Sequence, residues 1–495
     1  MQGTKIRLLV GGLLLVAASS SVQAEALQPD PAWQQGKLDN GFTWQLLATP
    51  QRPTDRIQLR LIVRAGSLVE TAQQTGFAHL LPHLALIRSQ SFSAPQLQSL
   101  WQQAIDSDRP LPPAISSYDY TLYNLSLPTN RPELLKEALT WLADTSGGLV
   151  TDAPTVQAAM DAFQDPIGTL PPDAQDPWWR YRMKGSTLLA HDPGQRPDRP
   201  VSIDELNKFY HQWYTPDAMT LYVVGNVDSR SMGEQISKTF GSLKGKRETP
   251  PVMPTLSPLP AQAVTLIADG LTQDRLSLIW DAPWQPIRDS QTLSRYWRSD
   301  LAREALFMHL QQQLNGKAKA MNLGFDCQVQ YQRSQCAIRM ESPNAALLPD
   351  FTALVTELAK VRDNGLTQQE FDALMAQKND QLSQLFATYA RTSTDVLTNQ
   401  RLRSQENGVV DIAPELYQKL RQEFLASLSL PLLNQELKQQ LSVDPALVLM
   451  QPKGEAEMSV QTLQEAYNSV MLPAPAVVPS VDDAKAEAAA AATTP

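Results

Sequence analysis

The sequence predicts an α+β fold in which one unit is used twice along the chain. The two halves share an order of segments: a helix, a Gly-containing turn, a second helix, and later a helix followed by one buried strand. Between the halves, residues 249–260 hold five prolines without hydrophobic periodicity, which is typical of an extended linker. We therefore expect two domains of similar size, residues 25–248 and 261–471.

In the first half, apolar runs that follow turn residues predict strands. The alternation in residues 57–63 is typical of a strand that buries one face only. Helical spacing of apolar residues predicts helices over 134–142 and 206–213. The remaining strands are expected over residues 42–47, 120–127 and 219–225.

In the second half, the segments that match the first half predict helices over 354–360 and from Gln368, and a buried strand over 446–450. From Leu472 onwards the chain is rich in Ala, Pro and Val, so we expect a disordered tail over residues 472–495.

The first 24 residues read as a secretory signal. Lys5 and Arg7 form a positive region, residues 8–18 an apolar region, and residues 22–24 a small-residue cleavage site before Glu25. A short membrane anchor is the alternative, but the apolar region falls short of the ~18 residues that a spanning helix needs. The interpretation predicts a mature protein, without a membrane span, in the periplasm.

The composition and net charge of the chain bear on the class of macromolecule that it binds. The formal net charge is −9, with 42% hydrophobic and 19% charged residues, as in ordinary globular proteins. An acidic chain without basic runs argues against nucleic acid as the main partner.

The chain has two cysteines, Cys327 and Cys336, which flank a segment that reads as a hairpin. In an oxidising compartment a disulfide across this hairpin is one outcome, and two free thiols on neighbouring strands are the other. Two cysteines alone cannot build a zinc ribbon.

The segment that carries chemistry is Gly76-Phe77-Ala78-His79-Leu80-Leu81-Pro82-His83. Two histidines four apart on a helix share a face and can bind one zinc ion. In the inverted zinc-peptidase motif H-x-x-E-H the glutamate is the general base, but here Pro82 takes its place. Inside a helix Pro82 costs about 3 kcal/mol or a kink, whereas a helix that begins at Pro82 would separate the two histidines.

Several stretches together resemble the insulinase/pitrilysin family of zinc metallopeptidases. They are Ala65-Gly66-Ser67, the histidine segment, Ser202 to Tyr210, and Trp213 to Met219 leading into Val223 to Asp228. The resemblance implies two tandem domains of antiparallel-rich sheets with packed helices, forming a clamp with zinc in the first domain.

The resemblance also implies three metal ligands, and His79 and His83 match the two histidines. The third family ligand is a glutamate, but residues 153–163 contain none, and Asp161 is the only carboxylate there. Family members also carry an Arg and a Tyr in the second half that orient the substrate. The corresponding stretch, residues 311–327, contains neither.

The sequence thus predicts a degenerate member, with no catalytic residue assigned, that binds a peptide or protein chain in the clamp. Zinc at His79, His83 and Asp161 follows only from the resemblance. Two alternatives stay open: an active zinc endopeptidase with an atypical third ligand and base, or a non-catalytic subunit that supports a peptidase partner.

Overall fold

The computed structural model describes residues 24–161, 166–315 and 321–472. The predicted signal segment except Ala24, and the predicted tail except Leu472, lie outside these residues. In the part of the chain that is described, no helix is both long and apolar enough to cross a membrane.

The N-terminal half is built on a seven-stranded sheet with the order β1-β2-β7-β3-β5-β4-β6. Its strands are β1 (Trp33–Lys37), β2 (Thr43–Ala48), β3 (Ile57–Val63), β4 (Ala114–Ser116), β5 (Thr121–Leu127), β6 (Gly168–Thr169) and β7 (Met219–Gly225). Its helices are η1 (Ser67–Val69), α1 (Phe77–Ile87), α2 (Ala94–Ala104), α3 (Pro132–Gly147), α4 (Ala153–Asp161), α5 (Pro177–Arg182), η2 (Thr187–Ala190), α6 (Ile203–Trp213), η3 (Pro216–Ala218) and α7 (Ser229–Phe240).

The C-terminal half is built on a five-stranded sheet with the order β10-β11-β9-β12-β8. Its strands are β8 (Ala263–Ala268), β9 (Asp274–Pro283), β10 (Asn322–Gln330), β11 (Arg333–Ser342) and β12 (Ala446–Pro452). Its helices are α8 (Ser290–Leu314), α9 (Asn344–Asn364), α10 (Gln368–Ser383), α11 (Leu385–Arg391), α12 (Thr394–Glu406), α13 (Pro414–Ser427), α14 (Leu430–Leu441) and α15 (Val460–Met471).

The two sheets repeat one topology. In the first, β2 lies parallel to the late strand β7, and β7 lies antiparallel to β3. In the second, β8 lies parallel to the late strand β12, and β12 lies antiparallel to β9. The predicted use of one α+β unit twice is therefore confirmed, and the edge strand β10 takes the place that β4 has in the first sheet.

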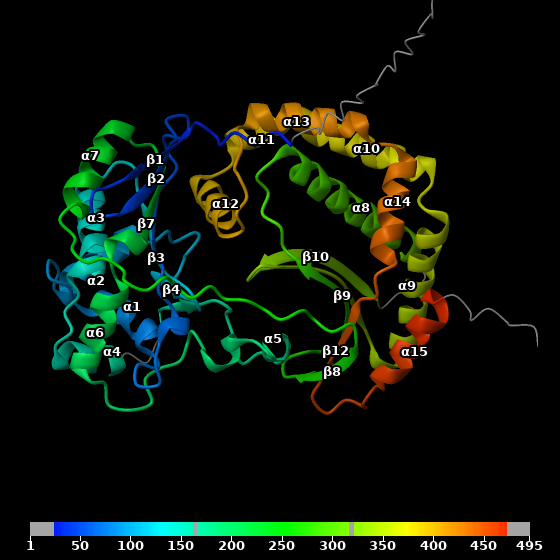
Figure 1. The fold of residues 1–495 in the computed structure, drawn as a ribbon, viewed down its shortest axis with the longest axis horizontal. Helices are drawn as coiled ribbons and strands as arrows, with labels where there is room; N and C mark the ends of the chain where they lie inside the picture. The colour runs from blue at the N-terminus through cyan, green and yellow to red at the C-terminus, as the bar shows by residue number, and fades with distance from the viewer. Residues whose placement is uncertain (1–23, 162–165, 316–320, 473–495) are drawn as a thin grey trace, which may run out of the picture.

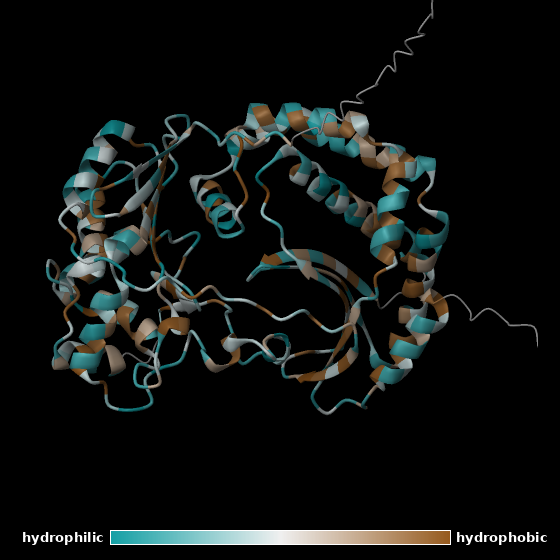
Figure 2. Cartoon of the chain, viewed as in Figure 1, coloured by the Kyte–Doolittle hydropathy of each residue, from teal (hydrophilic) through white to brown (hydrophobic). Residues whose placement is uncertain are grey.

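Each half has its own hydrophobic core between its sheet and its helices. The helices carry both hydrophobic and hydrophilic residues, as amphipathic helices that cover a sheet do (Figure 2). Residues 249–260 form no helix or strand and run between the two cores.

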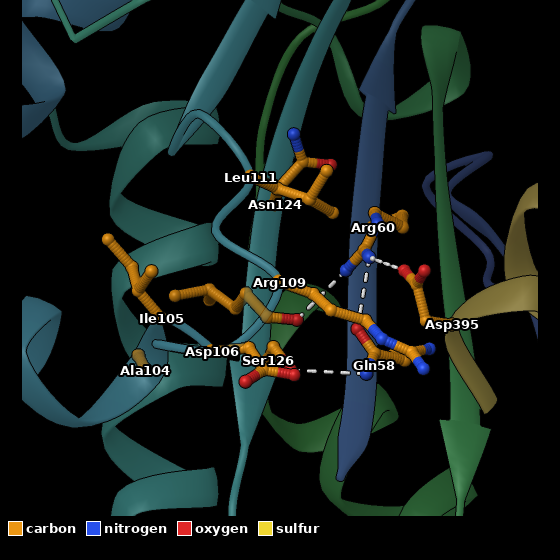
Figure 3. A pocket seen from close by; sticks show the side chains of 11 residues that line it. Gln58, Arg60, Ala104, Ile105, Asp106, Arg109, Leu111, Asn124, Ser126 and Asp395 are labelled. Atoms are coloured by element: carbon orange, nitrogen blue, oxygen red, sulfur yellow. Dashed lines mark hydrogen bonds and ion pairs between the residues drawn. The ribbon is translucent and has the colours of Figure 1, made fainter. Parts of the chain in front are cut away.

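The prediction for β3 was wrong in one respect, because every residue of this strand is buried. The reason is tertiary: α12 of the C-terminal half packs on β3 and β7, on the face that alternation left polar (Figure 1). Arg60 of β3 is 1% exposed, and its Nη2 lies 3.1 Å from Oδ1 of Asp395 in α12. Figure 3 draws this ion pair as a dashed line between the two labelled side chains.

A second contact between the halves lies at α5. Arg182 of α5 donates to the Ser257 carbonyl at 2.7 Å, and its Nη2 lies 3.3 Å from Oδ1 of Asp281 in β9. Both side chains are 2% exposed, and Arg333 of β11 binds the same carboxylate. A buried acid is thus held by one arginine from each half.

Candidate functional site

The two histidines lie on α1, which runs unbroken from Phe77 to Ile87 with Pro82 inside it. Of the two outcomes that the sequence left open, the interior proline is therefore the one observed. Gly76 precedes the helix with φ of 87°, and a Cβ there would lie 2.5 Å from the Pro197 nitrogen. Only glycine fits this position, so it fixes where the helix begins.

The imidazoles of His79 and His83 lie edge to face, buried in the N-terminal half. Their ring centroids are 5.1 Å apart at an interplanar angle of 75°, so the proline has not separated them. The side chains are buried, with exposed fractions of 3% and 5%. Nδ1 of His79 lies 3.2 Å from the Ser116 hydroxyl on β4, which ties the first ring to the edge of the sheet.

Glu70 holds the beginning of the histidine helix, a role that sequence reasoning missed. Its carboxylate accepts hydrogen bonds from the backbone N–H of Ala78 at 2.7 Å and of Gly76 at 3.0 Å. Burial nevertheless raises the pKa of Glu70 to about 7. A carboxylate at a helix N-terminus is favourable, but no sequence rule links Glu70 to a helix that begins seven residues later.

Asp161, the predicted third ligand, is the last residue of α4 and is exposed. Its Oδ1 accepts a hydrogen bond from Gln157 at 2.8 Å. Among the residues that the structure describes, no group of three or more His, Cys, Asp or Glu side chains is placed to hold a metal ion. Zinc takes three or four protein ligands, and the described residues supply two imidazoles here, so the zinc site at His79, His83 and Asp161 stays a prediction.

The edge of the sheet beside the histidines is covered by the chain itself. On the outer side of β4, Ile115 and Ser116 pair with Gly168 and Thr169 of β6. The pairing continues with a 2.9 Å hydrogen bond from the Leu170 N–H to the Ser116 carbonyl. An extended peptide can join a sheet only at an unpaired edge, so β6 takes the place that such a peptide would need.

The C-terminal half also places a tyrosine next to this edge. Tyr331, at the tip of the β10–β11 hairpin, packs on Tyr118 and Trp179 with ring centroids 5.7 Å and 6.1 Å apart. These two residues belong to a small buried cluster of the N-terminal half. Tyr331 lies four residues beyond the stretch 311–327 in which the resemblance placed a substrate-orienting tyrosine.

The hairpin that carries Tyr331 is braced by the two cysteines. Cys327 and Cys336 are directly opposite each other in β10 and β11 and form a disulfide, with their Cα atoms 4.1 Å apart. The turn between the strands is Tyr331-Gln332, and both residues have positive φ, 45° and 65°. Such turns are typical of two-residue hairpins.

Comparison with known proteins agrees with this architecture. The profile of the insulinase family (peptidase family M16) matches residues 46–164, and that of the peptidase M16 inactive domain matches residues 200–378. The chain is 58% identical to Protein YhjJ of Salmonella typhimurium over 98% of both chains. The chain belongs to the insulinase family.

Solved structures of the insulinase family show the same fold. One, described as a predicted insulinase family protease from Yersinia pestis, is 65% identical and superposes with a TM-score of 0.89 over 94% of this chain and 100% of that one. The periplasmic protease PqqL from Escherichia coli superposes with a TM-score of 0.77 over 91% of this chain and 51% of PqqL, at 20% identity. More distant members of the family are named probable zinc proteases.

Proposed function

We propose that this chain is a periplasmic insulinase-family protein that binds an extended polypeptide between its halves and does not cleave it. The observation that carries the proposal is Pro82, which stands where the family motif has its general base. Proline has no group that can take a proton from water. The predicted signal segment and the periplasmic location of PqqL support the compartment.

The open edge of the second sheet supports the binding mode. β10 is nine residues long, and its outer side pairs with no strand of the described residues, whereas β4 in the equivalent place is covered by β6. A polypeptide in extended conformation adds to such an edge through main-chain hydrogen bonds. These bonds need neither a metal nor a catalytic base.

The register of the hairpin identifies the free groups. Gln330 and Arg333 close the two-residue turn, so they form a hydrogen-bonded pair. Pairs alternate along an antiparallel ladder. The backbone N–H groups of Val329, Cys327 and Phe325 therefore point away from β11, towards the open side.

Fluorescein-labelled casein, an unfolded polypeptide, tests both parts of the proposal at once. Fluorescence anisotropy reports binding, and release of acid-soluble fluorescence reports cleavage. We expect saturable binding without cleavage, with and without added zinc. Zinc-dependent cleavage that the His79→Ala variant loses would overturn the proposal in favour of an active endopeptidase.

The variant Val329→Pro removes one outward N–H without touching a bond to β11, and proline is tolerated at strand edges. We expect it to weaken casein binding at least about tenfold. Val329→Thr keeps the N–H and serves as the matched control. Equal affinities of the two variants would mean that β10 is not the edge that binds.

A further inference from the structure

We propose that a cleft between the two halves, separate from the histidine helix, binds a ligand that carries an ammonium group on an apolar body. The cleft has a volume of about 340 Å³ and lies between the start of β1, helices α11 and α12, and residues 411–417. Ligand sites for small molecules begin at about 300 Å³, so the cleft has room for one. It goes beyond polypeptide binding, which involves other residues.

Asp30 is the anionic anchor of the cleft. Its side chain is buried, with an exposed fraction of 9%, and it lines the cleft. Oδ1 accepts the Ala32 N–H at 2.9 Å, and the Asp30 N–H donates to the Asp411 carbonyl at 2.8 Å. Within the described residues, Asp30 forms no ion pair with a lysine, arginine or histidine. A buried carboxylate without a cation is costly, so a cationic ligand would relieve that cost.

The other charges at the cleft already have partners. Nη1 of Arg401 lies 2.6 Å from Oδ2 of Asp411, and the guanidinium also donates to Oε1 of Gln45 at 2.7 Å. The guanidinium carbon of Arg401 lies 4.8 Å from the centre of the Trp33 ring. Behind the cleft wall, Arg52 donates to the carbonyls of Tyr389 and Thr392.

The pKa of Tyr389, which lines the cleft, depends on burial and on the charges around it. Burial is the largest cause that raises its pKa, and Asp30 and Glu415 raise it further, while Arg52 lowers it. Among the described residues, Asp30 is the carboxylate lining the cleft that has no ion pair, since Asp411 is paired with Arg401.

The walls of the cleft favour an apolar ligand body. Leu47, Leu397 and Ile412 line it together with the rings of Trp33 and Tyr417. Helix α11 closes one side, although none of its residues is buried. A single aromatic ring with a short aminoalkyl chain matches these walls in both chemistry and size.

The cleft exists only when the halves are together, because β1 and β2 belong to the first half and α11 to α13 belong to the second. A ligand that binds this arrangement better than an opened one shifts the protein towards it. The site would therefore couple a cationic small molecule to the closure of the clamp.

Isothermal titration calorimetry of the full mature chain with phenethylamine tests the proposal, with phenylacetate as the anionic counterpart. We expect saturable binding of the amine with one site and no binding of the carboxylate. Asp30→Asn should raise the dissociation constant of the amine at least about tenfold. Asp39→Asn, an exposed acid in the β1–β2 turn, should leave it unchanged.

A second variant keeps the test valid if Asp30→Asn fails to fold. Thr388→Trp fills the cleft from α11 and leaves the carboxylate in place, so it should also abolish binding of the amine. Absence of saturable binding in the millimolar range would overturn the proposal. So would equal binding of phenylacetate, or full affinity in a folded Asp30→Asn protein.

Discussion

Arg60 of β3 and Asp395 of α12 form an ion pair that joins the two halves, with 3.1 Å between Nη2 and Oδ1. Burial lowers the pKa of Arg60 to about 10, against the opposing effect of Asp395. The guanidinium also donates to the carbonyls of Leu59 and Leu125, so it is held inside the first sheet. The acid that compensates this buried charge comes from the other half of the chain.

Asp395→Ala should destabilise the protein by about 3 kcal/mol, because it leaves Arg60 buried without its counter-ion. Urea unfolding measures the change. Glu234→Ala is the control, since its partner Arg230 is 90% exposed and such surface pairs contribute less than about 1 kcal/mol. Equal effects of the two substitutions would contradict the role given to Asp395.

The purified mature protein should hold less than one equivalent of zinc after dialysis against trace zinc. Two imidazoles alone bind the metal weakly. The double variant His79→Ala, His83→Ala should therefore have the same zinc content as the wild type, measured by atomic emission. One full equivalent that is lost in the double variant would show that a further ligand completes the site.

Pro82→Glu alone should not create a peptidase. The substitution supplies the family's general base, but the described residues place only two imidazoles at the site. The measurement is release of fluorescence from labelled casein in the presence of zinc. Robust cleavage by this single variant, abolished by a chelator, would contradict the prediction.

The stability of the protein should fall as pH rises from about 4.5 to about 7, in part through Glu70. Burial raises its pKa from the ordinary 4.5 to about 7 in the folded state. A raised pKa means that proton binding favours the folded form. This contribution is complete below the unfolded pKa and is lost as pH rises through the folded one.

Glu70→Gln cannot titrate, so its free energy of unfolding should depend less on pH in this window. Urea unfolding at several pH values from 4 to 8 measures the two slopes. Glu234→Gln removes an exposed acid and should keep the wild-type slope. Identical slopes for wild type and Glu70→Gln would refute the assignment.

A reductant should lower the stability of the wild type by about 3 kcal/mol, the chain-entropy contribution of a loop as short as the one between Cys327 and Cys336. The chain has no other cysteine. The double variant Cys327→Ser, Cys336→Ser should therefore be less stable and indifferent to reductant. A reductant effect that persists in the double variant would point to a cause other than this disulfide.

Local sequence pattern by itself determined several strands and the repeated unit of this protein. Period and turn residues predicted β2, β7 and β12, and the order of segments predicted the repeated unit. Local pattern also predicted the hairpin between Cys327 and Cys336. Residues on the two strands that lie equally far from a tight turn pair with each other, so the turn sets the register.

Tertiary structure decided the rest, because contacts between distant segments leave no local periodicity. Alternation in 57–63 predicted one buried face, and only the docking of α12 buried the other. The sequence placed His79 and His83 on one helix face and named Pro82 as the obstacle. Packing of α1 on all sides, with Phe77 to Ala85 buried, kept the helix intact across the proline. Only the tertiary fold places β6 beside Ser116, Tyr331 beside Tyr118, and Asp30 at a cleft between the two halves.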